Sequence, residues 1–188
     1  MVLPPPAGRT RRQALQAALT GTLAATLAAT LPGTVRAQPS AGAKPPTEPA
    51  LPELGTLLAV PEVVLLDGSR HTRADAQGRV LVLYWWASWC PFCTLQSPHI
   101  DALWRQQQAR GLRVLGLSID RRAEDASRYL AQRGYGFPSA WVTPALAQAL
   151  PKPPGLPVTV VLGRDGRVRA AESGQLFPED IEQFARFL

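Results

Sequence analysis

The stretch WASWCPFCTLQSP, residues 86–98, holds both cysteines of this 188-residue chain, Cys90 and Cys93. It overlaps the end of the run RVLVLYWWA (79–87), which is apolar almost throughout and rich in β-branched and aromatic residues. Such a run is typical of a strand that is buried on both faces. The cysteine pair therefore follows a buried strand, and it is a redox centre, part of a metal site or a structural staple.

Strand and helix patterns alternate along the rest of the chain. A helix is expected to begin near Cys90–Pro91 and to run to about Arg110, where Gly111 ends it, with Pro98 inside it. Further strands are expected in VPEVVLLDGS (60–69), LRVLGLSID (112–120) and a hairpin within 150–174 that turns over Gly163–Gly166, and further helices at 123–134, 144–149 and 178–188. This order predicts an α/β fold, a central mixed sheet flanked by helices, with a short strand extension at its N-terminal side.

The positive charge is concentrated at the N-terminus. The net charge is +6, but residues 1–37 contain four arginines and no acid, which leaves 16 basic and 14 acidic residues, a net of +2, in the remainder. A domain so close to neutral offers no electrostatic case for binding phosphate backbones. No nucleic-acid partner is expected.

Residues 1–37 have the features of an export signal. Arginines at 9, 11 and 12 precede a weakly apolar stretch (13–31), and the small residues Val35 and Ala37 suit cleavage after Ala37. A retained amphipathic or transmembrane helix is the alternative, but four threonines make the stretch a poor anchor. We therefore predict delivery to the periplasm, with a Pro/Ala-rich flexible tether at 38–58 and the folded domain at 59–188.

The string TRRQALQ (10–16) bears on the export route. It resembles the twin-arginine signal, except that Ala14 stands where that signal prefers phenylalanine. The ordinary Sec route remains the alternative. Either route ends in an oxidising compartment, where disulfides form.

A metal site needs more ligands than two thiolates. In a regular helix His99 would lie about 240° around the axis from Cys93, pointing away from it. His71 is far away in sequence, and the single methionine is residue 1. No resident metal or cofactor is expected, although two thiolates can hold Cu(I) transiently.

A purely structural disulfide is the second alternative. Cross-links stabilise a fold mainly by closing long loops, and a two-residue loop removes little entropy from the unfolded chain. A redox role also accounts for the position of the two cysteines, just after a buried strand and at the start of a helix. At the first turn of a helix, unpaired amides and the helix dipole lower the pKa of a thiol, which favours Cys90 as the nucleophile. Cys93, one turn later, can then resolve a mixed disulfide.

The motif WASWCPFC (86–93) resembles the active-site signature of the thioredoxin superfamily. The resemblance extends over residues 60–188: Pro98 matches the proline within the family's first long helix, and GLPVTVVLGRDGRV (155–168) matches the segment that carries the family's cis-proline. It implies a thioredoxin fold in which Pro157 lies beside the disulfide and the backbone of Leu156 pairs with a substrate peptide. An exported chain of this kind looks like the TlpA/ResA-like branch of periplasmic thiol–disulfide oxidoreductases.

Two positions depart from these families. Thioredoxins place a buried aspartate six residues before the first cysteine, where this chain has Tyr84, and ResA-like proteins place a glutamate three residues after the second, where it has Gln96. The carboxylate manages the proton of the resolving thiol in both groups. Here that proton must leave Cys93 for water or for another group.

The resulting hypothesis is an enzyme that exchanges the Cys90–Cys93 dithiol or disulfide with protein substrates. Trp89, Leu156 and Pro157 are expected to contact the substrate, and the other tryptophans are assigned to the core. The resemblance implies a reductase, for example in cytochrome c or copper-protein maturation, supplied with electrons by a membrane thiol reductant. A net disulfide oxidant and a non-catalytic chaperone that binds Cu(I) or client proteins remain alternatives.

Overall fold

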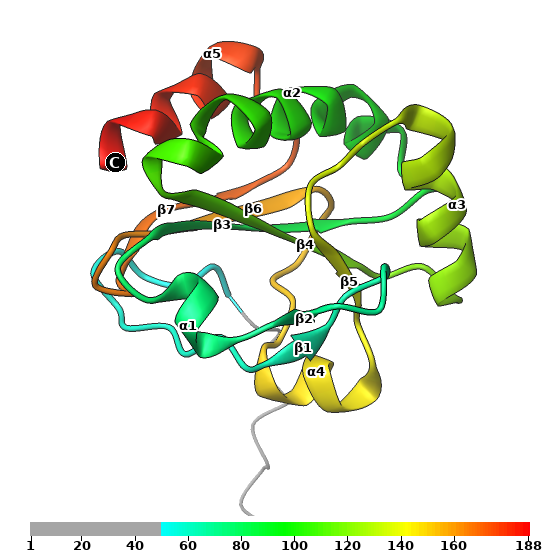
Figure 1. Cartoon of the computed structure of the whole chain (residues 1–188), viewed down its shortest axis with the longest axis horizontal. Helices are drawn as coiled ribbons and strands as arrows, with labels where there is room; N and C mark the ends of the chain where they lie inside the picture. The colour runs from blue at the N-terminus through cyan, green and yellow to red at the C-terminus, as the bar shows by residue number, and fades with distance from the viewer. Residues whose placement is uncertain (1–49) are drawn as a thin grey trace, which may run out of the picture. The chain divides into compact units, whose positions relative to one another are not determined.

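The computed structural model describes residues 50–188 (Figure 1). The predicted signal and most of the predicted tether lie outside the described residues. Five strands form the central sheet in the order β5-β4-β3-β6-β7: β3 (Val80–Trp86), β4 (Leu112–Ser118), β5 (Ser139–Trp141), β6 (Val158–Leu162) and β7 (Val168–Ser173). β4 is parallel to β3 and to β5, whereas β6 is antiparallel to β3 and to β7. The predicted mixed sheet is confirmed, and its arrangement with the helices is a thioredoxin fold.

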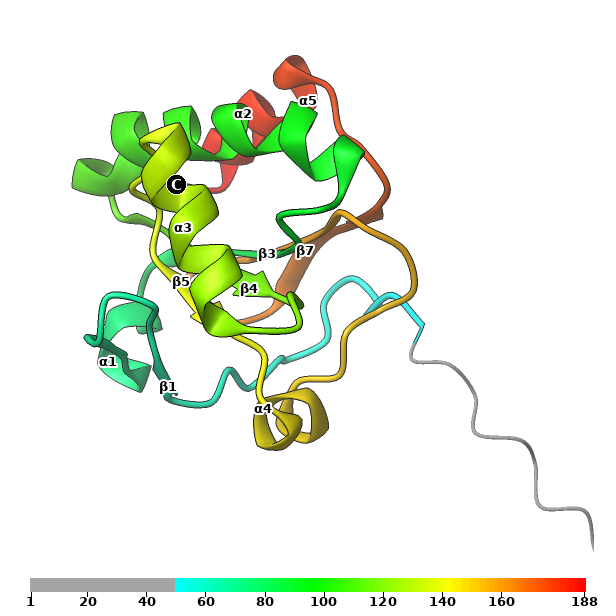
Figure 2. The ribbon, with the colours of Figure 1, turned by 90° about the vertical axis from the view of Figure 1, so that its right-hand side faces the viewer.

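Side chains of β3 alternate between two apolar layers, and all seven of its residues are buried. Residues 80, 82, 84 and 86 face a cluster to which three helices contribute: α2 (Pro91–Gln107), α3 (Ala123–Arg133) and α5 (Pro178–Glu182). Residues 81, 83 and 85 face α4 (Pro144–Ala149), β1 (Val63–Val64) and the segment that precedes it. The two layers appear above and below the sheet in Figures 1 and 2.

The remaining elements are short. β1 pairs with β2 (Arg70–His71) in a separate two-stranded sheet, which is the predicted N-terminal strand extension, and α1 (Arg73–Ala76) follows it. Short 3-10 helices, η1 (Gln108–Arg110) and η2 (Gln183–Phe187), extend α2 and α5. Gly111 ends the long helix with φ 100°, a backbone conformation that favours glycine. Within residues 50–188, no helix has both the length and the apolar character needed to cross a bilayer.

The folded part of the chain begins before residue 59. Gly55 N–H donates to the Val168 carbonyl at 2.8 Å, and Leu57 forms an antiparallel bridge with Arg167. The Arg167 guanidinium also donates to the Gly55 carbonyl at 2.8 Å. Residues 55–58 therefore add a short partner to the β6–β7 turn instead of belonging to a flexible tether. The Pro/Ala-rich composition of this segment gave no sign of the pairing, because the contacts of residues 55–58 are made by backbone groups and the segment has no alternating pattern of apolar side chains.

Gly116 stands at a crowded point of the sheet, opposite Tyr84 in the β3–β4 register. A Cβ atom there would clash with Ser139 Oγ and would lie 2.9 Å from the Phe137 ring and 3.0 Å from Trp86 Nε1. Gly116→Ala is therefore expected to lower the free energy of unfolding by about 2 kcal/mol, as measured by urea denaturation. Adding Ser139→Ala removes the closest obstacle and should restore part of that loss. An equally unstable double variant would contradict this account.

His71 is expected to make the stability of the fold depend on pH. Burial lowers its pKa, although the nearby Asp75 carboxylate partly opposes the shift, and its Nε2 has no hydrogen-bond partner in the described structure. Because the unfolded chain binds a proton near the ordinary histidine pKa of about 6.5 and the folded chain does not, stability should fall as pH falls below that value. Denaturation at several pH values between 7.5 and 5 should show a shallower loss for His71→Gln than for the wild-type chain. If the free energies of unfolding of the two proteins fall in parallel as the pH is lowered, His71 is not the cause of the pH dependence.

Candidate redox site

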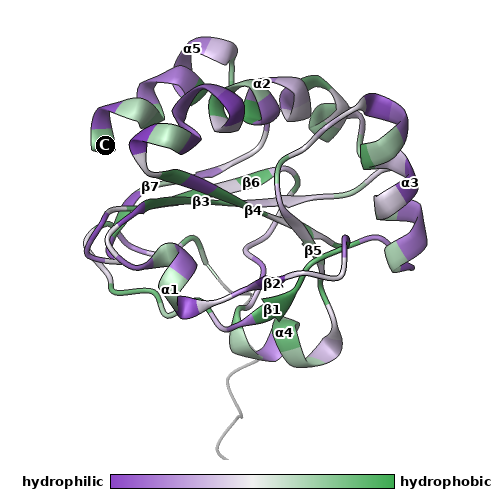
Figure 3. Cartoon of the chain, viewed as in Figure 1, coloured by the Kyte–Doolittle hydropathy of each residue, from purple (hydrophilic) through white to green (hydrophobic). Residues whose placement is uncertain are grey.

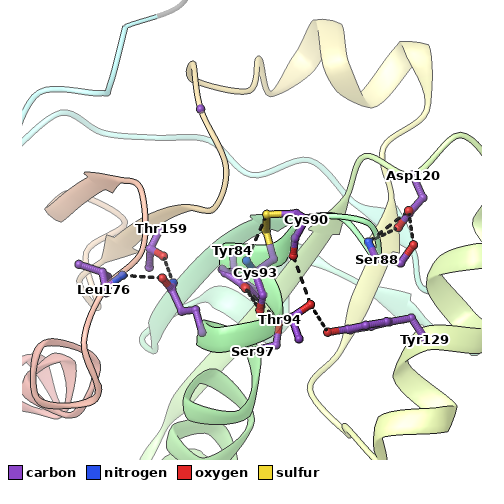
Figure 4. The surroundings of a disulfide bond; sticks show 12 residues. Tyr84, Ser88, Cys90, Cys93, Thr94, Ser97, Asp120, Tyr129, Thr159 and Leu176 are labelled. Carbon is purple, nitrogen blue, oxygen red and sulfur yellow. Dashed lines mark hydrogen bonds between the residues drawn. A yellow bond between two sulfur atoms is a disulfide. The ribbon is translucent and has the colours of Figure 1, made fainter.

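The disulfide lies where β3 ends and α2 begins (Figure 4). Cys90 is the N-cap of α2 and Pro91 occupies its first turn, where a missing N–H costs nothing. Cys90 and Cys93 are joined by a disulfide with their Cα atoms 5.2 Å apart. The Cys93 N–H donates to Cys90 Sγ at 3.1 Å. An amide aimed at the sulfur and the positive end of α2 both favour a thiolate at Cys90 once the disulfide is reduced.

Exposed apolar side chains flank this disulfide. Trp89, Phe92 and Leu95 are 63%, 54% and 55% exposed, whereas the two cysteines are buried. No charged residue occurs between Val80 and Pro98. Large exposed apolar side chains beside a reactive group favour a partner that covers them.

The peptide bond between Leu156 and Pro157 is cis, as the family resemblance implies. Val158, the next residue, is paired with Trp85 in the β3–β6 register, so the cis bond lies at the end of the sheet that carries the disulfide. The Pro157 carbonyl accepts from Gly174 N–H at 2.8 Å. Within residues 50–188 neither the N–H nor the carbonyl of Leu156 has a hydrogen-bond partner.

Tyr84 and Gln96 are both buried beside the cysteines and both are hydrogen-bonded. The Tyr84 hydroxyl lies 3.0 Å from Ser97 Oγ and donates to the Cys93 carbonyl at 3.4 Å. Burial raises the pKa of Tyr84 well above its ordinary value, so the hydroxyl stays protonated at physiological pH. The positions at which relatives of the two families carry a carboxylate are therefore occupied by neutral groups.

Gln96 links three elements around the site. Its Nε2 donates to Thr159 Oγ1 on β6 at 2.9 Å, and its Oε1 accepts from the Leu176 N–H, ahead of α5, at 2.7 Å. The first bond joins α2 to the strand that follows the cis-proline. Gln96 thus helps to fix the position of that strand relative to the helix that bears the cysteines.

Asp120 is a site residue that the sequence analysis missed. It follows β4, and its buried carboxylate accepts from the Ser88 N–H at 3.1 and 3.2 Å, from the Ser88 hydroxyl at 2.7 Å and from the Ser118 hydroxyl at 2.8 Å. Ser88 lies two residues before Cys90, so Asp120 anchors the turn that carries Trp89 and Cys90 (Figure 4). The available signal was an acid just past the end of a buried strand, since the carboxyl ends of parallel neighbouring strands meet at one edge.

The remaining residues singled out from the sequence lie apart from this chemistry. Trp85 and Trp86 are fully buried, as assigned, while Trp104 and Trp141 are half-buried at the periphery of the core. Among residues 50–188, no three histidine, cysteine, aspartate or glutamate side chains are grouped closely enough to hold a metal ion. The site is therefore built from the two sulfurs, the turn that Asp120 holds and the cis-proline segment.

Comparisons with known proteins agree with this geometry. Residues 58–171 match the model of the AhpC/TSA family. Thiol–disulfide oxidoreductase ResA of Geobacillus thermodenitrificans is 25% identical over 125 residues, which are 65% of this chain and 72% of that protein. ResA of Halalkalibacterium halodurans is 21% identical and covers 65% of this chain and 70% of its own length.

Solved structures with the same fold include two from Chlorobium tepidum. A thiol:disulfide interchange protein of the thioredoxin family has a TM-score of 0.66 at 21% identity and covers 72% of this chain and 97% of its own. A thiol:disulfide interchange protein described as DsbE has a TM-score of 0.59 at 26% identity, with 71% and 94% covered. A secreted disulfide oxidoreductase of Mycobacterium tuberculosis, homologous to Escherichia coli DsbE, has a TM-score of 0.60 at 17% identity, with 69% and 96% covered.

The fold, the adjacent cysteines and these relatives make the protein a thiol–disulfide oxidoreductase of the ResA/DsbE kind. The family model covers more than half of the chain, from Leu58 at the edge of the hairpin to Ala171 on β7. The chain therefore belongs to the AhpC/TSA family, within the thioredoxin superfamily.

Proposed function

We propose that this protein is a periplasmic protein-disulfide reductase in which Cys90 attacks and Cys93 resolves. The observation that carries the proposal is the position of Cys90, which caps α2 with its sulfur facing the Cys93 amide and is disulfide-bonded to Cys93. Uncharged apolar side chains surround this position and suit contact with a protein client.

The reaction transfers two electrons in two thiol–disulfide exchanges. The Cys90 thiolate attacks one sulfur of a client disulfide, which forms a mixed disulfide and releases the other client sulfur as a thiolate. The Cys93 thiolate then attacks Cys90 Sγ, so the second client sulfur leaves and takes up a proton. The client ends as a dithiol and the enzyme as the Cys90–Cys93 disulfide. A thiol reductant in the membrane restores the dithiol by the same exchanges.

Proton transfer from Cys93 is assigned to water. Tyr84 remains protonated and Gln96 is a neutral amide that does not take up a proton near neutral pH, so neither serves as the base. Their hydrogen bonds join α2 to β3, through Tyr84, and to β6, through Gln96. The resolving step should therefore accelerate as pH rises, because the thiolate is the attacking species.

Trp89, Leu156 and Pro157 are assigned to client binding. Trp89 offers an exposed ring next to the nucleophile, and the backbone of Leu156 offers an unpaired N–H and carbonyl. A client segment that runs past the cis bond can pair with Leu156 as an added strand. Its apolar side chains would then cover Phe92 and Leu95.

The redox state and location in cells test this proposal. The full chain, expressed in its bacterial host, is quenched with acid and alkylated with a maleimide that adds mass to each free thiol. We expect the periplasmic fraction to hold a mature form that begins at Gln38, mostly with both thiols free, and to become oxidised when the membrane thiol reductant is removed. A mature form that stays disulfide-bonded with that reductant present would contradict reductase function, and a cytoplasmic form would contradict export.

A further inference from the structure

In the described part of the chain, positively charged residues are concentrated at one end of the sheet. β3 and β4 begin, and β6 and α2 end, at the end of the sheet that lies away from the disulfide, on the left in Figure 1. The segments that meet there, which we call the basic end, are residues 53–58, 73–79, 108–113, 163–169 and 186–188. They contain eight arginines and three acidic residues. The rest of residues 50–188 contains seven basic and ten acidic residues, so the two parts have opposite net charge.

The arginines of the basic end are held in place without being neutralised. Arg164 donates to the Gly78 carbonyl at 3.3 Å, and Arg113 donates to the Gln108 carbonyl at 2.9 Å. A neutral carbonyl fixes a guanidinium but leaves its charge intact. Within residues 50–188, the ion pair of Arg169 with Asp165 is the one that involves this end. Most of the positive field therefore faces solvent.

Apolar groups lie among these arginines. A hollow of about 670 Å³ is lined by Leu58, Val60, Leu81 and Leu162, with Arg79 and Arg164 in its wall. Beside it, Leu57 forms its bridge with Arg167 and is nevertheless 63% exposed. Leu54, next to Gly55 on the same segment, is also exposed. Figure 3 shows hydrophilic and hydrophobic positions next to one another at this end.

We propose that the basic end is a docking surface for an anionic lipid bilayer. Lipid phosphates attract clustered arginines, and the interface below them accepts exposed leucines, so one partner accounts for both features. A segment made of acidic residues alone would account for the charge but would leave the leucines uncovered. The proposal goes beyond the redox function and requires no thiol chemistry. Docked in this way, the disulfide at the other end of the sheet points away from the bilayer, where soluble clients and a thiol that the membrane reductant extends into the periplasm can reach it.

The docking surface is tested by measuring how strongly the full chain binds lipid vesicles. The wild type and all variants keep the same N-terminal segment. The variant Arg73→Gln/Arg79→Gln/Arg110→Gln removes three arginines from the basic end that make no ion pair. The matched control Arg121→Gln/Arg128→Gln/Arg133→Gln removes the same charge from α3 and the turn before it. On vesicles of phosphatidylglycerol and phosphatidylcholine, the first variant should bind roughly 100-fold more weakly than wild type, and the control should lose far less. Equal losses, or equal wild-type binding to pure phosphatidylcholine, would overturn the proposal.

A second variant separates lipid from an acidic protein. Leu54→Ser/Leu57→Ser leaves the charge unchanged and should weaken vesicle binding at least several-fold. If binding is unchanged and polyglutamate displaces the wild-type protein from vesicles at low concentration, the surface takes an acidic polypeptide and the lipid assignment is wrong. Equal rates of insulin reduction in solution by all variants would show that each is folded.

The orientation has its own readout. Cys90 of the reduced wild-type chain should react with an uncharged polyethylene-glycol maleimide equally fast on vesicles and in solution. A tenfold slower reaction on vesicles would mean that the disulfide end faces the bilayer. This measurement depends only on thiol accessibility, so it separates failure of the docking proposal from failure of the reductase proposal.

Discussion

Replacing Cys90 with alanine is expected to lower the rate of insulin-disulfide reduction by about 1,000-fold or more, because the variant lacks the attacking sulfur. Cys93 is no substitute. It lies inside the first turn of α2, while Cys90 caps the helix and receives an amide hydrogen bond. The assay follows insulin precipitation with a chemical reductant that regenerates the enzyme.

Cys93→Ala is the matched variant and should fail in a different way. Its Cys90 can still attack, but no internal thiol remains to release the client, so a mixed disulfide should accumulate. Intact-protein mass spectrometry without reductant should find the client attached through Cys90. If Cys90→Ala forms the stable adduct and Cys93→Ala does not, the roles of the two cysteines are reversed.

The second large effect is expected from Asp120→Ala, which should lower the free energy of unfolding by about 3 kcal/mol. The substitution leaves the Ser88 N–H and two serine hydroxyls without their acceptor in a buried setting. It also frees the turn that positions Trp89 and Cys90, so insulin reduction should slow even under conditions where the variant is fully folded. Urea denaturation and the rate of exchange at low temperature measure the two effects separately.

Asp125→Ala is the control for that substitution. Asp120 and Asp125 both line a hollow beside Trp89, but the partners of Asp125 are the exposed Arg122 and Arg128. Asp125→Ala removes the same charge as Asp120→Ala but leaves no buried donor unpaired. The losses of unfolding free energy and of insulin-reduction rate should therefore both be smaller than for Asp120→Ala. Equal effects from the two substitutions would mean that charge near the turn matters and that the hydrogen bonds of Asp120 do not.

Local patterns predicted the framework of the site. The apolar run at 79–87 became β3, and Pro91 and Gly111 bound the long helix and its final turn as capping rules require. The cysteine spacing placed both sulfurs on one turn of that helix. Each of these inferences depends on residues within a few positions of one another, which is the range over which a sequence pattern carries structural information.

The missed features join segments that are distant in sequence. Asp120 meets Ser88 across 32 residues, and Arg167 meets Gly55 across 112. The basic end escaped notice for the same reason, since a net charge of +2 conceals arginines that only the strand topology brings together. The sequence showed that Gln96 stands where ResA-like proteins have a glutamate, but it did not show the contacts of Gln96 with Thr159 and Leu176.

The reduction potential of the Cys90–Cys93 couple tests the central claim most directly. The protein is equilibrated in graded thiol–disulfide buffers, and the fraction of disulfide is measured by alkylation and mass spectrometry. We predict a single two-electron couple at a potential near that of thioredoxin, roughly −270 mV, as a reductase requires. A value near that of the strong oxidants, about −120 mV, would make the protein a disulfide donor and contradict the account.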